Sequence, residues 1–447
     1  MADTVGLTSP PERKGIRRLW FAFSQLFAHT PLLGWLLGVL LASGIERIAG
    51  TSFARLIGLG KAPVLFGVDI ALKTPALLPA TLLYDLIIYV IPIFLVVRFL
   101  SPLANRVAGW LLRYPMGVSA VVHVLLLYFG LHLWTGVSDY RVLVAKLMLI
   151  AIMITLSLNV VNGYMGEFSC SHPGFMALGA YIASLVTVVL LVGGSNFGPA
   201  RLPAALGPFL FPIALILGGL VAALGAMLVA FPSFRTRGDY LAIISLAFMF
   251  IVKSLFENLE ALGGARGFGN QPNLASLPVV FIWTMLCIWI INNFVQSTMG
   301  KALNAVRDGE LAADAMTVDT RKTKMIAFLF AAFWAGVAGG LFAHVLRYVN
   351  PGTFGLQKLA EVLAMLYFGG LNSVTGSIVG AVGYNLLSEM LRPLELFKWI
   401  IIPLLLILVM LFRPTGLIAF REFNLRNILQ PKQQPSKEEV KNVPSAS

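Results

Sequence analysis

The stretch PFLFPIALILGGLVAALGAMLVAF, residues 208–231, contains no charged side chain. Its length suits a helix that crosses a bilayer, because roughly 20 mostly apolar residues span about 30 Å of hydrocarbon. The whole chain shares this composition, since 58% of its 447 residues are hydrophobic and only 12% are charged. A soluble domain carries roughly 25% charged residues. The sequence therefore predicts an all-α integral membrane protein, built as a polytopic bundle of helices.

About twelve apolar stretches of the chain are candidate membrane spans. They are residues 31–49, 80–99, 115–134, 142–162, 174–193, 208–231, 239–256, 279–296, 325–348, 359–371, 374–391 and 397–412. FGGLNSVTG, residues 368–376, interrupts the region 359–391 with Gly369 and Gly370, and its first helix is short for a full crossing. This pair of stretches could be one re-entrant element, so broken or re-entrant helices are expected in the bundle.

The distribution of Lys and Arg orients the spans, because cytoplasmic loops carry an excess of these residues. The predicted loops on the same side of the membrane as residues 297–324 contain more Lys and Arg than the loops on the other side. We therefore expect this loop and both termini to be cytoplasmic. Residues 1–30 are basic and aromatic, as expected of an interfacial segment. Residues 418–447 are polar and rich in Pro and Ser, and they are predicted to form a disordered cytoplasmic tail.

The composition argues against nucleic-acid binding and against a metal centre. The net charge is +13, but the basic residues are scattered between apolar runs and form no continuous basic surface. Cys170 and Cys287 are the two cysteines, and neither belongs to a CxxC pair. The histidines lack metal-ligand spacing to one another: His29, His123, His132, His172 and His344. No cofactor and no metal are expected, and the lipid bilayer is the predicted environment.

The chain also lacks the motifs of an ATPase or another enzyme. The stretch nearest to a phosphate-binding loop is RLIGLGKAP, residues 55–63. It fails because Arg55 occupies the position of the first glycine and Ala62 that of the Ser or Thr. There is no GxSxG or HExxH motif. The chain therefore shows no ATP site of its own, and any energy that it uses must come from elsewhere.

RDGELAADAM, residues 307–316, brings three acids and a base into the apolar chain. Its residues mostly favour helix, and Glu310 and Asp314 are four positions apart on one face. The candidate interaction residues are Glu310, Leu311, Ala312, Ala313, Asp314, Ala315 and Met316. This short polar helix either docks against a partner protein, which its alanines would approach closely, or is a solvated loop helix without a partner.

The region 159–181 combines helix-breaking glycines with polar side chains. The glycines are Gly163, Gly166, Gly174 and Gly179, and the polar candidates are Asn159, Asn162, Ser169, Ser171 and His172. A broken helix presents backbone groups to a polar solute where it faces protein or water. The alternative is that the glycines only allow close packing of helices. Both interpretations remain open from the sequence.

Ionisable residues inside apolar spans are costly and often functional. The candidates are Asp85, His123, Lys146, Lys253, Glu361 and Glu389. Several lie near predicted helix ends, where such side chains reach water. Glu361 is the best substrate-path candidate among them. It is either a polar group that packs between helices, the interpretation favoured slightly, or part of the lining of the path.

Four stretches resemble the permease subunit of branched-chain amino acid ABC transporters, of the LivM type. They are SLNVVNGYMGEFSCSHPGFMALGAYIASL (157–185), RTRGDYLAIISLAF (235–248), STMGKALNAVRDGELAADAMTVDTRKTKMIAFLFAAFWAGVAGGLFA (297–343), and MLYFGGLNSVTGSIVGAVG (365–383) with FRPTGL (412–417). The resemblance implies an ABC permease core over residues 141–417. Residues 31–140, with about three further spans, form an N-terminal extension outside the resemblance.

The resemblance also implies partners and a role. It implies a permease of the bacterial inner (cytoplasmic) membrane for branched-chain or other small apolar amino acids. The implied partners are two ABC ATPase subunits, a second homologous permease in a heterodimer, and a periplasmic or extracellular substrate-binding protein. The loop 307–324 would couple the permease to the ATPases, with residues 310–316 as the coupling helix. ATP hydrolysis would occur on the partner subunits.

The chain departs from the family pattern at several positions. Thr317 follows Met316 where the family usually has glycine, and Asn372 stands for a glycine in the pattern GG-x-GS-x-x-GP. Ser377 stands for its proline. These changes leave the substrate open, so an importer for urea or short amides is an alternative. An ion-coupled secondary transporter and a membrane scaffold that transports nothing are alternatives of a different class.

Overall fold

The computed structural model describes residues 30–64, 66–194, 197–234, 240–413, 416–418 and 429. Over these residues the chain is almost entirely helical, with four strands of two residues each. The predicted all-α membrane fold is thereby confirmed. The basic segment 1–30 and the tail 418–447 lie outside the described residues, apart from residues 30, 418 and 429.

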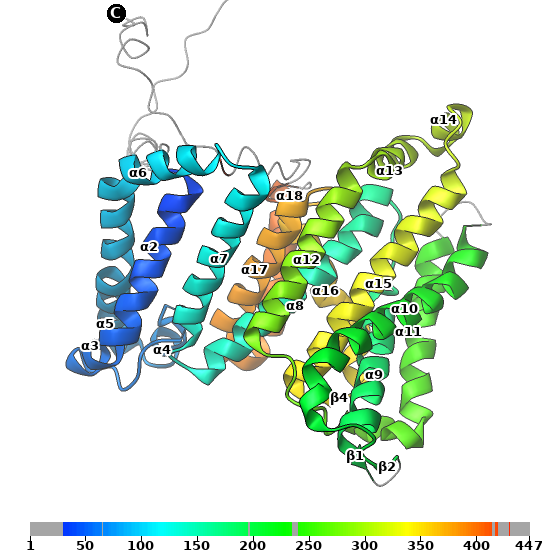
Figure 1. Cartoon of the computed structure of the whole chain (residues 1–447), viewed down its shortest axis with the longest axis horizontal. Helices are drawn as coiled ribbons and strands as arrows, with labels where there is room; N and C mark the ends of the chain where they lie inside the picture. The colour runs from blue at the N-terminus through cyan, green and yellow to red at the C-terminus, as the bar shows by residue number, and fades with distance from the viewer. Residues whose placement is uncertain are drawn as a thin grey trace, which may run out of the picture. The chain divides into compact units, whose positions relative to one another are not determined.

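The chain divides into two compact units. Figure 1 shows the ribbon coloured by residue number from blue to red. Unit 1 comprises Met1–Ala62, Leu77–Val137 and Asn424–Ser447. Unit 2 comprises Pro63–Ala76 and Ser138–Phe423.

Unit 1 consists of helices joined by two π-helical turns. Its elements are α2 (Leu32–Ile45), η1 (Glu46–Gly50), α3 (Thr51–Leu56), α5 (Leu78–Asp85), η3 (Leu86–Val90), α6 (Ile91–Leu111) and α7 (Met116–Thr135), with the short turn η2 (Pro75–Leu77) before α5. The Glu46 side chain is fully buried. It accepts hydrogen bonds from the Tyr84 hydroxyl at 3.1 Å and the Tyr89 hydroxyl at 2.6 Å. This buried network links the η1 and η3 regions within unit 1.

Unit 2 contains the remaining helices and two short antiparallel strand pairs. Its helices are α4 (Val68–Lys73), α8 (Asp139–Asn159), η4 (Val160–Met165), α9 (His172–Thr187), η5 (Val188–Val192), α10 (Gly207–Ser233), α11 (Tyr240–Asn258), α12 (Leu277–Gln296), α13 (Thr298–Asp308), α14 (Glu310–Ala315), α15 (Thr320–Leu346), α16 (Leu356–Gly369), α17 (Val374–Met390) and α18 (Lys398–Phe412). Short 3-10 turns are η6 (Ala204–Leu206), η7 (Glu260–Leu262), η8 (Gly264–Arg266), η9 (Pro351–Phe354) and η10 (Arg392–Phe397). Strand β1 (Gly193–Gly194) pairs with β2 (Gly198–Pro199), and β3 (Phe268–Gly269) pairs with β4 (Tyr348–Val349).

The core of unit 2 is the packing of α9, α10 and α15, and glycines allow their backbones to meet. A Cβ added at Gly179 of α9 would lie 2.0 Å from the Gly336 carbonyl oxygen of α15. A Cβ at Gly339 would lie 1.9 Å from the carbonyl oxygen of Met176. Small residues at such crossings are typical of helix packing in membranes, where close backbone approach drives association.

Nine helical segments of the described residues are long and apolar enough to cross a membrane. They are Leu32–Leu56, Pro75–Leu111, Met116–Thr135, Asp139–Met165, His172–Val192, Ala204–Ser233, Tyr240–Asn258, Leu277–Gln296 and Thr320–Leu346. Nine of the twelve predicted spans overlap with these segments. The other three correspond to α16, α17 and α18, which have 14, 17 and 15 residues. At 1.5 Å per residue these helices are shorter than the roughly 30 Å hydrocarbon layer. Of the about twelve candidate spans, nine are therefore long enough for a full crossing among the described residues.

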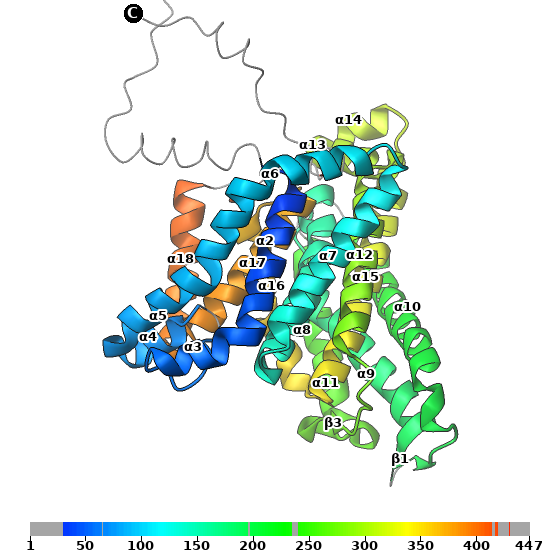
Figure 2. The same ribbon diagram turned by 60° about the vertical axis from the view of Figure 1, so that its left-hand side comes forward.

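The polar and irregular segments of unit 2 gather at its two ends. Figures 1 and 2 both show α13 and α14 at one end, beyond α12 and α15. The strand pairs lie at the opposite end. The region 159–181 and the stretch RDGELAADAM both belong to unit 2.

Candidate functional site

A helix break separates α8 from α9 at residues 160–171. α8 passes into the π-helical turn η4, and Gly166 then takes a left-handed φ of 77°. Residues 166–171 are not helical, and α9 begins at His172. Residues 169–171 are buried, and the Cys170 amide donates to Ser245 Oγ of α11 at 2.9 Å. Residues 169–171 of the break are thus covered by protein, whereas Gly166 and Phe168 are exposed.

The Asn159 side chain forms hydrogen bonds with the loop between α16 and α17 and with the first turn of α17. Its Nδ2 donates to the Ser373 carbonyl at 2.9 Å and to Ser377 Oγ at 2.7 Å. Its Oδ1 accepts from the Asn372 amide at 3.0 Å. A Cβ at Gly163 would lie 1.8 Å from Asn159 Oδ1, so Gly163 leaves room for this arrangement. In this conformation the Asn159 side chain fastens two parts of unit 2 and has little capacity left for a solute.

The other polar candidates line the break itself. Asn162 Oδ1 accepts from the Ser169 amide at 3.2 Å, and Ser169 Oγ lies 2.9 Å from Ser171 Oγ. Neither Asn162 Nδ2 nor the ring nitrogens of His172 have a hydrogen-bond partner in the part of the chain that the structure describes.

The unpaired atoms of Asn162 and His172 are the groups of the break that are available for hydrogen bonds. Buried polar groups are nearly always hydrogen-bonded, so each exception asks for an explanation. An amide donor and an imidazole can hydrogen-bond a small solute that enters the break. Burial raises the pKa of the Cys170 thiol, which disfavours its reactive thiolate form. The arrangement therefore suits binding and passage better than covalent chemistry.

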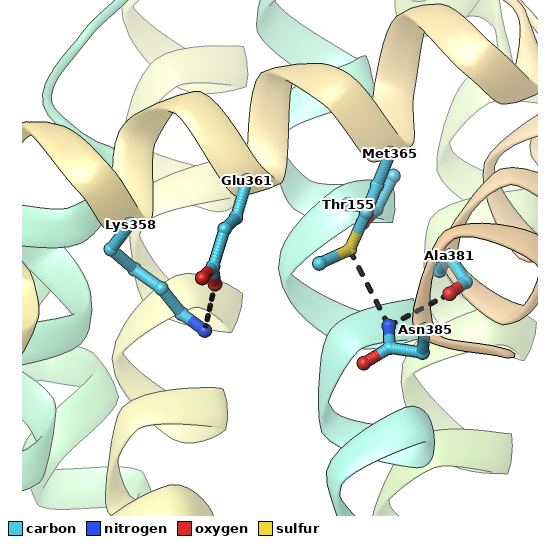
Figure 3. A network of polar contacts seen from close by, with 6 residues as sticks. All are labelled: Thr155, Lys358, Glu361, Met365, Ala381 and Asn385. Atoms are coloured by element: carbon cyan, nitrogen blue, oxygen red, sulfur yellow. Dashed lines mark hydrogen bonds and ion pairs between the residues drawn. The ribbon is translucent and has the colours of Figure 1, made fainter. Parts of the chain in front are cut away.

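Glu361 lies apart from the break, on α16. Its Oε2 pairs with Lys358 Nζ one turn away at 3.1 Å, and both side chains are mostly buried. Figure 3 shows this pair beside the contact of Asn385 Nδ2 with Met365 Sδ, at 3.7 Å. Asn385 Nδ2 also donates to the Ala381 carbonyl at 2.8 Å. Glu361 is thus neutralised within its own helix.

Other intramembrane candidates also have partners close in sequence. Lys253 pairs with Glu257 at 3.6 Å, and Glu389 pairs with Arg392 at 3.1 Å. Both pairs lie toward helix ends, where long side chains reach water.

An apolar groove of about 790 Å³ lies where α9, α10 and α11 meet. Leu178, Leu224, Phe231, Phe248 and Leu255 are among its lining residues, and the lining contains no charged side chain. A ligand site normally places a few polar groups among apolar ones to orient its ligand. This groove offers no partner to a carboxylate or ammonium group, so it is a poor candidate for an amino acid site.

The stretch RDGELAADAM forms the end of α13 and the whole of α14. The two helices are separated by Gly309, whose backbone is extended. α14 ends in two capping bonds: the Thr317 amide donates to the Asp314 carbonyl at 3.0 Å and the Val318 amide to the Ala313 carbonyl at 3.1 Å. This is the Schellman arrangement, which places a left-handed residue after the helix. That residue is Thr317, with φ of 68°.

α14 exposes most of its side chains. Leu311 is 72% exposed and Met316 is 77% exposed, while Asp314 is exposed as well. Ala313 is buried against the rest of unit 2. The six-residue helix and its C-cap residue Met316 together expose two large apolar side chains, a surface suited to a partner.

Glu310 has a partner within the chain. Its Oε2 lies 2.9 Å from Lys324 Nζ, and the same ammonium lies 2.6 Å from Glu167 Oε1. Lys324 begins the apolar part of α15 and its side chain is 9% exposed. The three charges therefore join α14, α15 and the helix break.

Glu167 and Lys324 were not among the residues singled out from the sequence. Glu167 directly follows Gly166, and Lys324 directly precedes the apolar run of α15. An acid beside the helix-breaking Gly166 and a base at the start of a span are the sequence signals that could have identified them. Their pairing spans 157 positions of the chain, so neither signal alone could indicate it.

The described residues contain no cluster of three or more His, Cys, Asp or Glu that could hold a metal ion.

Comparison with known proteins shows the family. Residues 140–412 match the family model described as branched-chain amino acid transport system / permease component. The chain is 30% identical over 325 residues to the high-affinity branched-chain amino acid transport system permease protein LivM of Escherichia coli K12, which covers 65% of this chain and 72% of that protein. It is 23% identical over 293 residues to the corresponding permease protein BraD of Pseudomonas aeruginosa, with 60% and 91% of the two chains covered. No solved structure matches.

The matching region covers more than half of the chain and contains both the helix break and α14. The nine apolar helical segments of the described residues agree with a permease that crosses the membrane several times. The chain therefore belongs to the family of permease components of branched-chain amino acid transport systems.

Proposed function

We propose that this protein is the transmembrane permease subunit of an ATP-driven importer for branched-chain or other small apolar amino acids. The observation that carries the proposal is the exposed α14 at one end of a family permease. Its partners in this proposal are two ATPase subunits, a second homologous permease and a substrate-binding protein outside the membrane.

The energy source has to be supplied by a partner. The stretch closest to a phosphate-binding loop has Arg55 in place of its first glycine and Ala62 in place of its Ser or Thr. Without that loop the chain has no cradle for the phosphates of ATP. Docked ATPase subunits would provide both the nucleotide site and the movement that drives transport.

α14 has the properties of a docking element. Leu311 and Met316 present apolar surface beyond the long helices, and Asp314 adds a negative charge beside them. An apolar groove flanked by basic residues on a cytoplasmic ATPase would complement this surface. Charges at such an interface set specificity and encounter rate.

The docking test reverses the charge of Asp314. Glu310 is unsuitable because its reversal would also break the ion pair with Lys324. We expect the Asp314→Lys variant to lose its ATPase subunits during co-purification while remaining folded, because exposed substitutions usually change stability by only about 0.5 kcal/mol. The matched control is Glu260→Lys, an exposed acid in η7 between α11 and β3. Retention of the ATPases by Asp314→Lys at the level of this control would refute the docking role.

The substrate assignment rests on the relatives and on the chemistry of the break. The LivM and BraD proteins are named as branched-chain amino acid permeases. The unpaired polar atoms at the break come from Asn162 and His172, which suit a small solute better than a polyanion. Specificity would also reside in the binding protein.

Uptake by the reconstituted transporter tests the substrate. Proteoliposomes with permeases, ATPases and binding protein should import leucine, isoleucine or valine only when ATP is present on the ATPase side. Import of urea with these amino acids ignored would replace the substrate assignment by a short amide. Leucine uptake by the permease alone under an ion gradient would instead indicate a secondary transporter.

A further inference from the structure

We infer that Lys324 transmits the movement of α14 to the helix break, because it is held between Glu310 of α14 and Glu167 of the break. The inference rests on the proposed docking of ATPases to α14. It adds two positioning residues, Glu167 and Lys324, to the transport mechanism.

The geometry makes Lys324 a shared anchor. Its Nζ lies 2.6 Å from Glu167 Oε1 and 2.9 Å from Glu310 Oε2. Lys324 is mostly buried, whereas the Glu310 side chain is 47% exposed and accessible from the outer end of unit 2. A buried charge is costly unless it is paired. Movement of α14 therefore changes how the ammonium group is shared between the two carboxylates.

A second contact joins the same loop to the same break. Arg307 at the end of α13 packs directly on Gly166, where an added Cβ would lie 2.4 Å from Arg307 Cγ. Arg307 Nη1 also approaches the Gly163 carbonyl oxygen at 3.5 Å. The segment 163–167 thus contacts α13 through packing and Lys324 through charge. α13 and α14 cannot move as a body without displacing this segment or breaking both contacts.

The displaced segment leads directly into the polar part of the break. Glu167 is followed by Ser169, whose amide is bound to Asn162 Oδ1, and by Cys170, whose amide is bound to Ser245 of α11. A shift at Glu167 would strain these bonds and expose the unpaired polar atoms nearby. Docking at α14 would in this way open or close the break to a solute.

Two substitutions test the linkage in the complete reconstituted transporter. Glu167→Gln keeps the size of the side chain and an oxygen that accepts from Lys324 while it removes the charge. Lys324→Met keeps an unbranched side chain and removes the ammonium group. We expect both variants to co-purify with the ATPases, because the exposed face of α14 is unaltered. Leucine uptake should fall about tenfold or more, within the range of typical coupling between sites, and Lys324→Arg should restore part of it.

A structural readout separates transmission from simple stability. Cys170 lies in the break and is 6% exposed, whereas Cys287 of α12 is fully buried. Maleimide labelling of Cys170 in the wild-type transporter should change between the nucleotide-free and the vanadate-trapped states. In Glu167→Gln and Lys324→Met the labelling should be the same in both states. Cys170→Ser measures any labelling of Cys287.

The controls separate this inference from the proposed function. Lys253→Met breaks an ion pair on α11 without touching the break, and it should transport like the wild type. Normal uptake and nucleotide-dependent labelling in both test variants would overturn the transmission role. If both test variants behaved like the wild type while Asp314→Lys still lost its ATPases, docking at α14 would be supported and only the role of Lys324 would be refuted. Retention of ATPases by Asp314→Lys would instead remove the proposed function itself.

Discussion

Thr317 occupies a backbone position that ordinarily belongs to glycine. It closes α14 with φ of 68°, and a β-branched residue is a genuine outlier in the left-handed region. The left-handed conformation costs an L-residue roughly 1–2 kcal/mol. We predict that Thr317→Gly stabilises the cap by about 1 kcal/mol, after allowing for the larger unfolded-state entropy of glycine. The resemblance noted from the sequence implies glycine at this position, and the structure shows the physical consequence of the departure.

Hydrogen exchange measures the effect on the cap. The Val318 amide bonds to the Ala313 carbonyl only while the cap is formed. Its exchange should slow about fivefold in Thr317→Gly, the factor that corresponds to roughly 1 kcal/mol. Thr317→Ala serves as the comparison, because alanine also lacks the conformational freedom of glycine and should gain less. Equal or faster exchange at Val318 in the glycine variant would contradict the strain argument.

Gly166 is constrained both by its backbone and by its neighbour. Its φ is 77°, and a side-chain carbon there would meet Arg307 Cγ at 2.4 Å. We predict that Gly166→Ala destabilises the protein by about 2 kcal/mol, the sum of left-handed strain and overpacking. The thermal midpoint of the purified protein in detergent should fall. Gly269→Ala is the control in the same unit, since its Cβ would make an ordinary contact of 3.8 Å with Tyr348. A Gly166→Ala midpoint equal to that of the control would show that Arg307 yields freely.

At the scale of elements, the α16–α17 hairpin depends on a residue from α8. The Asn372 amide donates to Asn159 Oδ1, and Asn372 itself takes a left-handed φ of 54°. Asn tolerates this region better than most residues, which fits its place where the family has glycine. Asn159 anchors the hairpin through these hydrogen bonds, and substrate contact at Asn159 stays a prediction.

We predict that Asn159→Ala destabilises the hairpin. The Asn372 amide would lose its acceptor, and a buried polar group without a partner costs about 1–3 kcal/mol. Exchange of the Asn372 amide should accelerate, and the thermal midpoint should fall. Asn258→Ala on α11 is the control, because the Asn258 side chain is exposed and bonds only within its own helix. An unchanged midpoint with a raised KM for leucine would favour substrate contact over anchoring.

The sequence predicted the helical segments more reliably than it predicted which side chains contact one another. Apolar runs of about 20 residues located the nine long segments because bilayer thickness alone fixes that signal. The glycines around residue 369 correctly marked short helices, where a full crossing was doubtful. The partner of Glu310 could not be predicted, since Lys324 lies on the next helix and the geometry of the turn at Thr317 decides whether they meet.

At the scale of the whole molecule, the orientation in the membrane remains a prediction from charge. The region from the end of α12 through the start of α15 carries Lys301, Arg307, Arg321, Lys322 and Lys324, whereas the connection between α11 and α12 has Arg266 as its basic residue. Cytoplasmic loops hold the excess of Lys and Arg. α14 should therefore face the cytoplasm, where ATP and ATPase subunits are available.

Cysteine labelling in cells tests this orientation. Ala312 of α14 and Ala261 near the strand-bearing end are both exposed, and both native cysteines are buried. Between the two positions α12 is the one described segment long and apolar enough to cross a membrane, so we expect the two positions on opposite sides. We predict that an impermeant maleimide added outside intact spheroplasts labels Ala261→Cys and leaves Ala312→Cys unlabelled until the cells are opened. The reverse pattern would place α14 outside, where no ATPase could reach it, and labelling of both from outside would contradict the single crossing by α12.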